Sequence, residues 1–228
     1  MKRPLFGASL ALAFVVAGGF CGFAHRPLAI LDTRAGPEQA LMVEELDVSQ
    51  VAYCELTAAA PAFWMTLELS MAATLDLSLG VPVTDRLAAF RPAIAVLGPG
   101  LPAVDLGFPV PAGLGGLILR SAGASDPERF YEPFTGTESW ILGEWEIDLS
   151  QPGRYYVVAC APSGEVGKLW VALGKREAFS VGDILALPKT IQAVRRFHEV
   201  AGNPAWLNVF VYGAVALAAL GLWRTTAR

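Results

Sequence analysis

The sequence predicts a mainly β protein, an antiparallel β-sandwich of jelly-roll type, followed by a juxtamembrane helix and a transmembrane helix. Three observations carry this prediction. Apolar residues alternate with polar ones in the middle of the chain, Gly and Pro separate short apolar runs there, and two long apolar runs lie at the chain ends. Of the 228 residues, 54% are hydrophobic and 17% charged. A soluble domain typically has ~25% charged residues, so a membrane segment is expected.

The first apolar run follows two basic residues. Lys2 and Arg3 precede the uncharged residues 5–24, which predicts a signal peptide or an uncleaved signal anchor over residues 1–24. Because the basic flank of a first segment usually stays in the cytoplasm, the middle of the chain is expected on the extracytoplasmic side of the plasma (inner) membrane.

Periodicity of two marks the strands of the predicted domain, residues 25–180. Leu alternates with polar residues in 75–79, and the apolar side chains of 63–69 have the same spacing. Residues 91–100 and 113–121 are apolar runs bracketed by Gly or Pro, which predicts strands in the middle of a sheet. About eight strands result when four further segments are added: 51–57, 139–150, 153–162 and 167–177, the last two joined by a turn at 162–167. A closed barrel is the alternative architecture.

The strand at 139–150 has an apolar and an acidic face. The apolar face is expected to carry Ile141, Trp145, Ile147 and Leu149, and the acidic face Glu144, Glu146 and Asp148. Carboxylates at this spacing could serve as a general acid and base or hold Ca²⁺. The solvated face of an amphipathic strand predicts the same spacing, and we favour it.

Four sequence segments carry a resemblance. "GPGLP", "FYEPFTGTESW", "GRYYVVA" and "GKLWVALGKREAF" occur in an order that resembles uncharacterised membrane-anchored extracytoplasmic β-sandwich proteins. Residues 45–180 are more loosely similar to pre-peptidase C-terminal-type sandwiches. The resemblance implies a fold and an accessory role rather than catalysis, and no functional residue is transferred by it.

The segment 130–140 is the predicted recognition loop. It is dense in aromatic and acidic residues: Phe130, Tyr131, Glu132, Phe134, Glu138 and Trp140. Such a loop could stack on a glycan or a peptide, or it could close one end of the core. Acidic residues from Asp126 onward could hold Ca²⁺, but the EF-hand spacing is missing, so this is a weak expectation and no cofactor is predicted.

No catalytic residue is identified, and the chain is not expected to be an enzyme. The two histidines, His25 and His198, adjoin the predicted membrane segments, and neither lies in a G-x-S-x-G context. Cys and His pairs for zinc are missing. Residues 25–180 hold ten Lys and Arg against nineteen Asp and Glu, a net charge of −9, so nucleic acid is not an expected partner.

Cys54 and Cys160 both fall in predicted strands. An extracytoplasmic domain would permit a disulfide between them, and two buried free thiols are the alternative. The spacing does not decide between the two, because it does not show how closely their Cα atoms approach.

A helical linker is predicted over residues 181–204. Ser180 and Asp183 have capping-box spacing, Pro188 should end a first short helix, and Gly202 should end a second one. The second helix, from about 188 to 201, is amphipathic. Its apolar side should carry Ile191, Val194, Phe197, His198 and Ala201, and its polar side Lys189, Gln192, Arg195, Arg196 and Glu199. The apolar side would lie either in the outer lipid headgroups, with Arg195 and Arg196 on phosphates, or on the sandwich.

Residues 205–223 are predicted to form a transmembrane helix, with 224–228 as a cytoplasmic tail. Two classes of function follow from this organisation. The first is a membrane-tethered extracytoplasmic module that binds membrane lipid, a protein or a glycan. The second is an extracytoplasmic hydrolase that uses carboxylates on glycans. Two carboxylates in one cleft, with at least one perturbed pKa, would favour the hydrolase.

Overall fold

The computed structural model of the chain describes residues 25–121, 127–178, 180–202 and 204. The predicted end segments 1–24, 205–223 and 224–228 lie outside the described residues. Within the described ranges, no helix is both long enough and apolar enough to cross a membrane.

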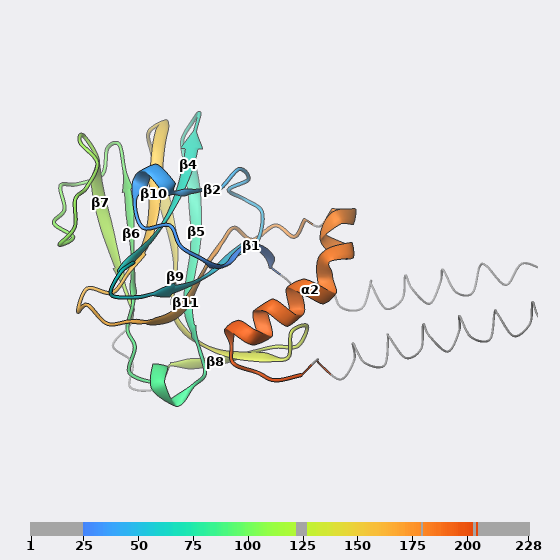
Figure 1. The fold of residues 1–228 in the computed structure, drawn as a ribbon. Helices are drawn as coiled ribbons and strands as arrows, with labels where there is room; N and C mark the ends of the chain where they lie inside the picture. Colours follow the sequence, from blue (N-terminus) through green and yellow to red (C-terminus); the bar gives the residue numbers. More distant parts are fainter. Residues whose placement is uncertain (1–24, 122–126, 179, 203, 205–228) are drawn as a thin grey trace, which may run out of the picture.

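Two β-sheets pack face to face and form a sandwich (Figure 1). The six-stranded sheet has the order β1 (Arg26–Asp32), β3 (Gln50–Leu56), β11 (Gly167–Leu173), β5 (Ala73–Pro82), β9 (Thr137–Leu149) and β8 (Glu128–Glu132). The five-stranded sheet has the order β2 (Leu41–Met42), β4 (Ala62–Leu69), β10 (Gly153–Cys160), β6 (Ala93–Gly98) and β7 (Gly115–Arg120). The other described elements are the 3₁₀ helices η1 (Pro37–Gln39) and η2 (Asp85–Leu87) and the helix α2 (Val181–Phe197).

Most connections carry the chain from one sheet to the other. Among strands that follow each other in sequence, only β6–β7 and β8–β9 pair directly in the described part of the chain. The ladders are antiparallel except β1–β3 and β2–β4, which are parallel. The predicted mainly β sandwich is confirmed. One finer expectation is wrong, since β7, predicted in the middle of a sheet, is an edge strand. β10 and β11, which the predicted turn joins, lie in different sheets.

The main core lies between the two sheets. From β5, Leu75, Leu77 and Leu79 point into it, and each is at most 2% exposed. From β4, Phe63 and Met65 do the same. Complete burial of such side chains contributes about 1.5–3 kcal/mol each to folding, so the alternation seen in the sequence sets the orientation of both strands.

The five-stranded sheet is covered on its outer face as well. Trp64 packs edge-on against Tyr156 and against Phe108, with ring centroids 5.6 Å apart in both pairs. Phe108 belongs to the long segment between β6 and β7, which folds over this face. This second cluster explains why Trp64 is buried although it occupies the position in β4 that alternates with the main core.

The two cysteines of the domain are free thiols in different clusters. Cys54 points into the main core, whereas Cys160 belongs to the cluster on the outer face of the five-stranded sheet. That sheet therefore lies between them, and of the two alternatives the structure has the buried free thiols.

A β-bulge in β9 changes the face on which one predicted core residue lies. Leu79 pairs with Gly143 and Gly80 pairs with Ile141, so Leu142 has no partner in this ladder. Leu142 enters the main core, and Ile141 packs on the outer face, contrary to expectation. A bulge inserts one unpaired residue, and a period of two cannot reveal it. C-terminal to the bulge, Trp145 packs on the main core as predicted.

The linker forms one helix rather than two. Its start is as predicted, because Asp183 N–H donates to Ser180 Oγ at 3.1 Å and the Asp183 carboxylate accepts from Ser180 N–H at 2.7 Å. Pro188 lies inside α2, and the ribbon of this helix is bent (Figure 1). Proline removes one hydrogen bond and crowds the preceding turn, which bends a helix when packing holds both halves.

The helix ends at Phe197, before the predicted stop at Gly202, and Glu199 is the left-handed residue that follows it. Glu199 adopts φ 62°, and Val200 N–H donates to Arg195 O at 2.9 Å, as at a left-handed helix terminus. Glu199 also forms ion pairs with Arg86 and, at 2.9 Å, with Lys168. These contacts to η2 and β11 hold a non-glycine residue in a left-handed conformation.

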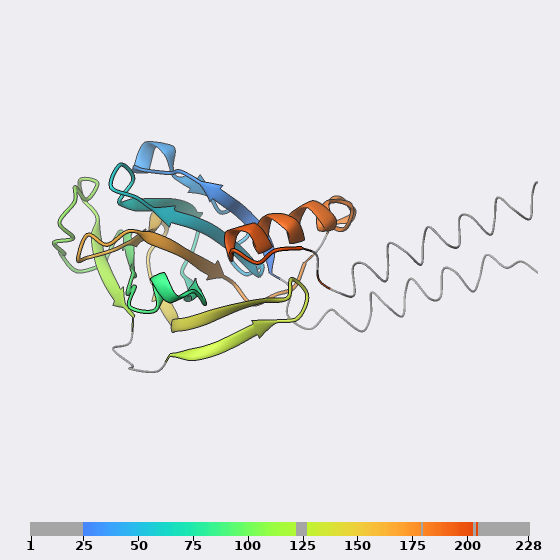
Figure 2. The same ribbon diagram turned by 60° about the horizontal axis from the view of Figure 1, so that its bottom comes forward.

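The apolar side of α2 packs on the outer face of the six-stranded sheet. Phe197 is fully buried there in a cluster with Val51, Trp170 and Ala172, and its ring lies edge-on to Tyr53 at 5.0 Å. The structure therefore has the sandwich-docked alternative for this helix. Figure 2 shows α2 beside the β8–β9 hairpin at one end of the sandwich.

Candidate functional site

The predicted recognition loop is a β-hairpin at the edge of the six-stranded sheet. β8 and β9 pair from Glu128↔Ile141 to Glu132↔Thr137. The turn closes with Gly136 N–H donating to Glu132 O at 2.8 Å, and Gly136 adopts φ 63°, a conformation that favours glycine. The hydroxyls of Thr135 and Thr137 lie 2.7 Å apart inside the turn. The "FYEPFTGT" segment thus encodes a rigid turn with a buried inner side.

The six candidate residues of this segment have different surroundings. Tyr131 is exposed, Phe130 is half-buried, and Glu138 pairs with Arg129 at 2.8 Å on the surface. Trp140 packs against the main core. Glu132 and Phe134 line a pocket between the hairpin and α2. The structure therefore brings only two of the six to a common cavity.

Arg195 joins α2 to the hairpin. Its Nη1 donates to the carbonyl oxygens of Thr135 at 2.7 Å and Gly136 at 3.1 Å. Its Nη2 and Nε donate to Ala201 O at 2.8 Å and Gly202 O at 2.6 Å. Arg195 is only 7% exposed, so of the two alternatives the structure does not have the one that placed it on lipid phosphates. Aligned carbonyl dipoles replace the water that a buried guanidinium loses.

His198 makes a second link between the same two elements. Its Nδ1 lies 2.9 Å from Val194 O and its Nε2 lies 3.1 Å from Ser139 Oγ, which also accepts from Trp170 Nε1 at 2.9 Å. Nδ1 must carry the proton because a carbonyl only accepts, so Nε2 is free to accept from the serine hydroxyl. Burial lowers the pKa of His198 to about 4, and the imidazole is neutral near pH 7.

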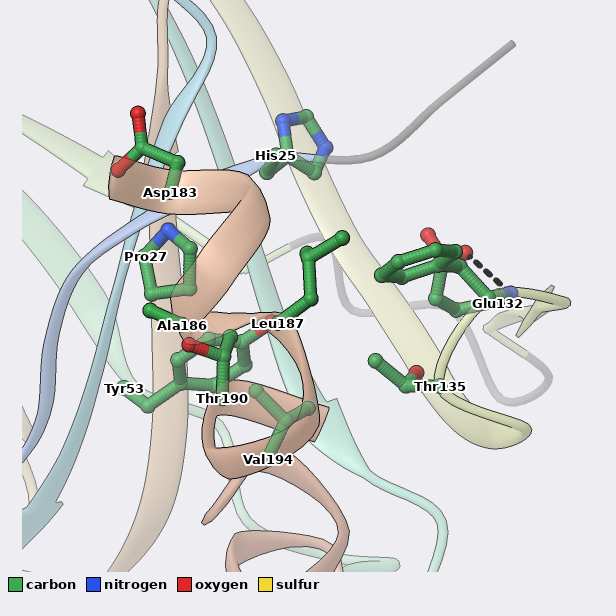
Figure 3. Close-up of a pocket in the computed structure, with 11 residues that line it drawn as sticks. His25, Pro27, Tyr53, Glu132, Thr135, Asp183, Ala186, Leu187, Thr190 and Val194 are labelled. Atoms are coloured by element: carbon green, nitrogen blue, oxygen red, sulfur yellow. Dashed lines mark hydrogen bonds between the residues drawn. The ribbon is translucent and has the colours of Figure 1, made fainter. Parts of the chain in front are cut away.

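The pocket between these elements has a volume of about 220 Å³ (Figure 3). We call it the helix–hairpin pocket. Four parts of the chain line it, namely the start of β1, β3, the hairpin turn and α2. The residues are His25, Pro27, Tyr53, Glu132, Phe134, Thr135, Asp183, Ala186, Leu187, Thr190 and Val194.

Charge in the pocket is negative. No Lys or Arg is among its described lining residues. Burial raises the pKa of Glu132; the Phe134 N–H, at 2.9 Å, lowers it, and Glu177 raises it further. Burial lowers the pKa of His25, which keeps that imidazole neutral. Hydrogen bonds from Ser180 lower the pKa of Asp183, so that carboxylate stays charged as the helix cap.

Tyr53 forms part of the wall of the helix–hairpin pocket, and it packs against the cluster that buries Phe197 of α2. Its ring lies 5.9 Å from that of His198, measured between centroids. Burial, and then the charge of Glu132, raise the pKa of the Tyr53 phenol. The hydroxyl therefore stays protonated at neutral pH. No pattern in the sequence indicates that Tyr53, in a β-strand, would lie near Glu132.

A second and larger cavity lies on the outer face of the five-stranded sheet. It has a volume of about 790 Å³ and runs between η1, the start of β4 and the segment 106–112. Trp64, Phe108 and Cys160 are among its walls, and Glu38 is the one charged residue of its described lining. Burial raises the pKa of Cys160 to about 11, so this thiol is protonated and a poor nucleophile.

The acidic face of β9 is solvent-exposed, as predicted. Glu144, Glu146 and Asp148 are all exposed, Glu146 pairs with Lys175 at 3.2 Å, and Asp148 accepts from Thr74 Oγ1 at 3.0 Å. Asp126, proposed above for Ca²⁺, lies outside the described residues. Over residues 25–121, 127–178, 180–202 and 204, no group of three His, Cys, Asp or Glu side chains could hold a metal ion.

Comparison with known proteins finds distant structural neighbours. No protein-family model and no curated protein sequence matches the chain. The pre-peptidase C-terminal domain of a collagenase from Bacillus anthracis aligns with a TM-score of 0.34 at 14% identity, over 60% of this chain and 97% of that one. CorA, described as a surface-associated copper-binding protein of Methylomicrobium album BG8, aligns with a TM-score of 0.28 at 11% identity, over 65% of this chain and all of that one. Both likenesses are too distant to assign a function.

Proposed function

We propose that this protein is a membrane-tethered extracytoplasmic β-sandwich that acts as a binding module, with the helix–hairpin pocket as its ligand site. The two apolar end segments of the sequence support the tether. Both ends of the described chain also lie at the pocket. His25 lines it, and a Cβ placed on Gly136 of the hairpin turn would lie 3.6 Å from the Cβ of Pro204. The site would therefore face the membrane surface.

One observation carries the proposal of a binding site. Two elements about 60 residues apart in sequence are locked together by Arg195 and His198, and they enclose a pocket rather than close on each other. Apolar walls with a few fixed polar groups are typical of ligand pockets. The lining combines Leu187 and Val194 with Glu132, so it has both features. A rigid frame also reduces the entropy lost on binding.

Binding is favoured over catalysis because the basic side chains at this end already have structural roles. His198 has hydrogen bonds at both ring nitrogens, and His25 Nδ1 is hydrogen-bonded to Ser49. Cys54 is buried in the core with a raised thiol pKa. None of the three is poised as a nucleophile or a general base.

A carboxylate-dependent hydrolase acting on glycans is the second candidate function. The pocket holds one carboxyl with a raised pKa, Glu132, and one with a lowered pKa, Asp183, which is the arrangement of a general acid and its partner. Two features rank it second. Figure 3 shows the two residues on opposite sides, with Leu187 between them. A volume of about 220 Å³ is also too small for a glycan chain.

Filling the pocket tests the proposed site. Thr190→Trp places a large ring on the pocket side of α2, and Gln192→Trp places the same ring on the exposed side of that helix. We expect cross-linking in the native membrane to capture a ligand or partner with wild type and Gln192→Trp, and to lose it with Thr190→Trp. Identical capture by both variants would refute the site.

The orientation of the domain is tested separately. Glu165 is exposed between β10 and β11, whereas Cys54 and Cys160 are buried. A membrane-impermeant maleimide should label Glu165→Cys in whole cells with the outer envelope opened. Labelling that requires rupture of the inner membrane would place the domain in the cytoplasm.

A further inference from the structure

We propose that the helix–hairpin pocket binds a small organic cation, an alkylammonium group, with Glu132 as its counter-ion and the rings of Phe134 and Tyr53 as part of its wall. This inference rests on the proposed function, since it names the ligand chemistry of the same site. Three features of the described part of the pocket carry it: a carboxylate without a paired cation, a lining without Lys or Arg, and aromatic rings beside that carboxylate.

The carboxylate of Glu132 has an incomplete set of partners. Its Oε1 accepts from Phe134 N–H at 2.9 Å, and within the described ranges Glu132 forms no ion pair. Two other acidic residues of this region do have partners, since Glu138 pairs with Arg129 and Asp183 accepts from Ser180. Burial makes the charged form of Glu132 costly, and a bound cation would offset that cost.

The basic groups closest to the pocket are directed elsewhere or neutral. Arg195 lies behind Thr135, and its four hydrogen bonds go to carbonyl oxygens. His25 is kept neutral by burial. The charge of Arg26 acts on Asp183, but its guanidinium donates to Gln50 at 3.1 Å and pairs with Glu45 at 3.5 Å. A cationic ligand would therefore meet no Lys or Arg among the described lining residues, while an anionic ligand would meet Glu132 and Asp183.

The walls suit an ammonium group with attached carbon atoms. Phe134 and Tyr53 are both lining residues, and aromatic faces attract cations with about 0.5–2 kcal/mol. Leu187 and Val194 supply apolar contacts for methyl or methylene groups. The small volume, about 220 Å³, accommodates a head group rather than a glycan chain.

The position of the pocket suggests two sources of this chemistry. Because both described chain ends meet here, the pocket would lie close to the lipid head groups. An ammonium group could come from a choline or ethanolamine head group or from a free amine in solution. The recognition chemistry is the same in both cases.

Choline and its neutral isostere, 3,3-dimethyl-1-butanol, provide the direct test. The full-length protein is placed in phosphatidylglycerol nanodiscs, which contain no ammonium group, and titrated with each probe by calorimetry. We expect choline to bind and the neutral isostere to bind at least about tenfold more weakly. Glu132→Gln should weaken choline binding about tenfold or more, whereas Glu138→Gln, the same change on the exposed side of the hairpin, should leave it unchanged.

The pH dependence supplies a second readout. Acid should weaken choline binding as Glu132 is protonated, beginning above the pH at which an ordinary glutamate titrates, because its pKa is raised. The other titratable groups facing this carboxylate are His25, Tyr53, Asp183 and Glu177. In acid His25 would gain positive charge, and Asp183 and Glu177 would lose negative charge, so all three act in the same direction. The residual pH dependence of Glu132→Gln measures that contribution.

A third arm separates the two sources. In nanodiscs that contain phosphatidylcholine, a head group in the pocket would compete with added choline and raise its apparent Kd. An unchanged Kd would assign the pocket to a soluble amine. Both results support ammonium recognition, and they differ only in where the ligand comes from.

Three results would overturn the proposal: equal binding of choline and its isostere, equal affinity of Glu132→Gln and Glu138→Gln, or no choline binding up to about 10 mM, the millimolar limit of a specific weak site. If Glu132→Gln lowers the melting temperature by more than a few degrees, Thr190→Trp replaces it as the blocked variant. If Thr190→Trp still abolishes partner capture while choline fails to bind, the pocket remains the binding site and only its cation chemistry is wrong.

Discussion

Replacing Arg195 with Met should release α2 from the β8–β9 hairpin. The guanidinium makes four hydrogen bonds to backbone carbonyls, two on the hairpin turn and two on the segment that follows the helix. Methionine retains the aliphatic stem and removes all four donors. Lysine would keep the charge, but a single ammonium group cannot reach two diverging pairs of carbonyls.

The cost can be worked out from the acceptors. Thr135 is buried, and Gly136 beside it is half-buried, so their carbonyls lose a partner that water replaces poorly, whereas Ala201 and Gly202 are exposed and can be rehydrated. A hydrogen bond to a charged group contributes about 1.5–3 kcal/mol, which gives about 3–6 kcal/mol for the two hairpin bonds. The variant also avoids the cost of burying the guanidinium charge, which offsets part of this loss. The net destabilisation is then about 2–4 kcal/mol.

Hydrogen exchange on the full-length protein measures this quantity locally. Amides of α2 and of the hairpin turn should exchange about 30- to 700-fold faster in Arg195→Met, since 1.4 kcal/mol corresponds to a factor of ten. Arg196 is the matched control, because it is exposed and adjacent, and Arg196→Met should change exchange by less than about twofold. Equal effects of the two substitutions would refute the assignment of Arg195 as the link.

Three further predictions concern other parts of the domain. Trp145→Ala should destabilise the protein by about 2–4 kcal/mol in chemical denaturation, because the ring packs on the core. Glu146→Gln, on the exposed face, should cost less than about 0.5 kcal/mol. Equal costs would mean that the strand register is wrong. The stability of the domain should fall as the pH is lowered from 6.5 to about 4, because His198 binds a proton below pH 6.5 in the unfolded chain and only near pH 4 in the folded one. In His198→Gln, melting curves recorded across this range should show a pH dependence of stability that is smaller by about 3 kcal/mol. An unchanged pH dependence would contradict this assignment. Cys54 and Cys160 should react with a thiol reagent only on unfolding, and rapid labelling of either in the native protein would show that its cluster opens.

Local signals in the sequence were sufficient for much of the fold. Alternation oriented β4 and β5 correctly because one side of each strand meets the core, and the Ser180–Asp183 capping box located the start of α2. Both signals depend on residues within one or two turns of each other. The bulge at Leu142 and the assignment of β10 and β11 to different sheets depend on pairing with distant strands, so no local pattern reports them.

The site was predictable only in part for the same reason. Glu132 and Phe134 were identified from the density of acidic and aromatic residues in their segment, and both line the pocket. Tyr53 and Thr190 come from β3 and α2, and only the docking of the helix brings them to the hairpin. A buried arginine among backbone carbonyls has no sequence signature, since its partners are not side chains.

The surroundings of Arg195 explain why amphipathicity alone could not distinguish the two alternatives for α2. A helix in the head-group plane and a helix docked on a protein both bury Val194 and Phe197, so the spacing of apolar residues is the same in each case. The difference lies at the border of the apolar stripe. A membrane-surface helix leaves its flanking arginine in water or on phosphate, whereas α2 buries Arg195 and His198 together with the stripe and satisfies both through the hairpin and the chain after the helix. Docking therefore needs polar partners placed by another element, and in this chain the turn of the "FYEPFTGT" segment supplies them.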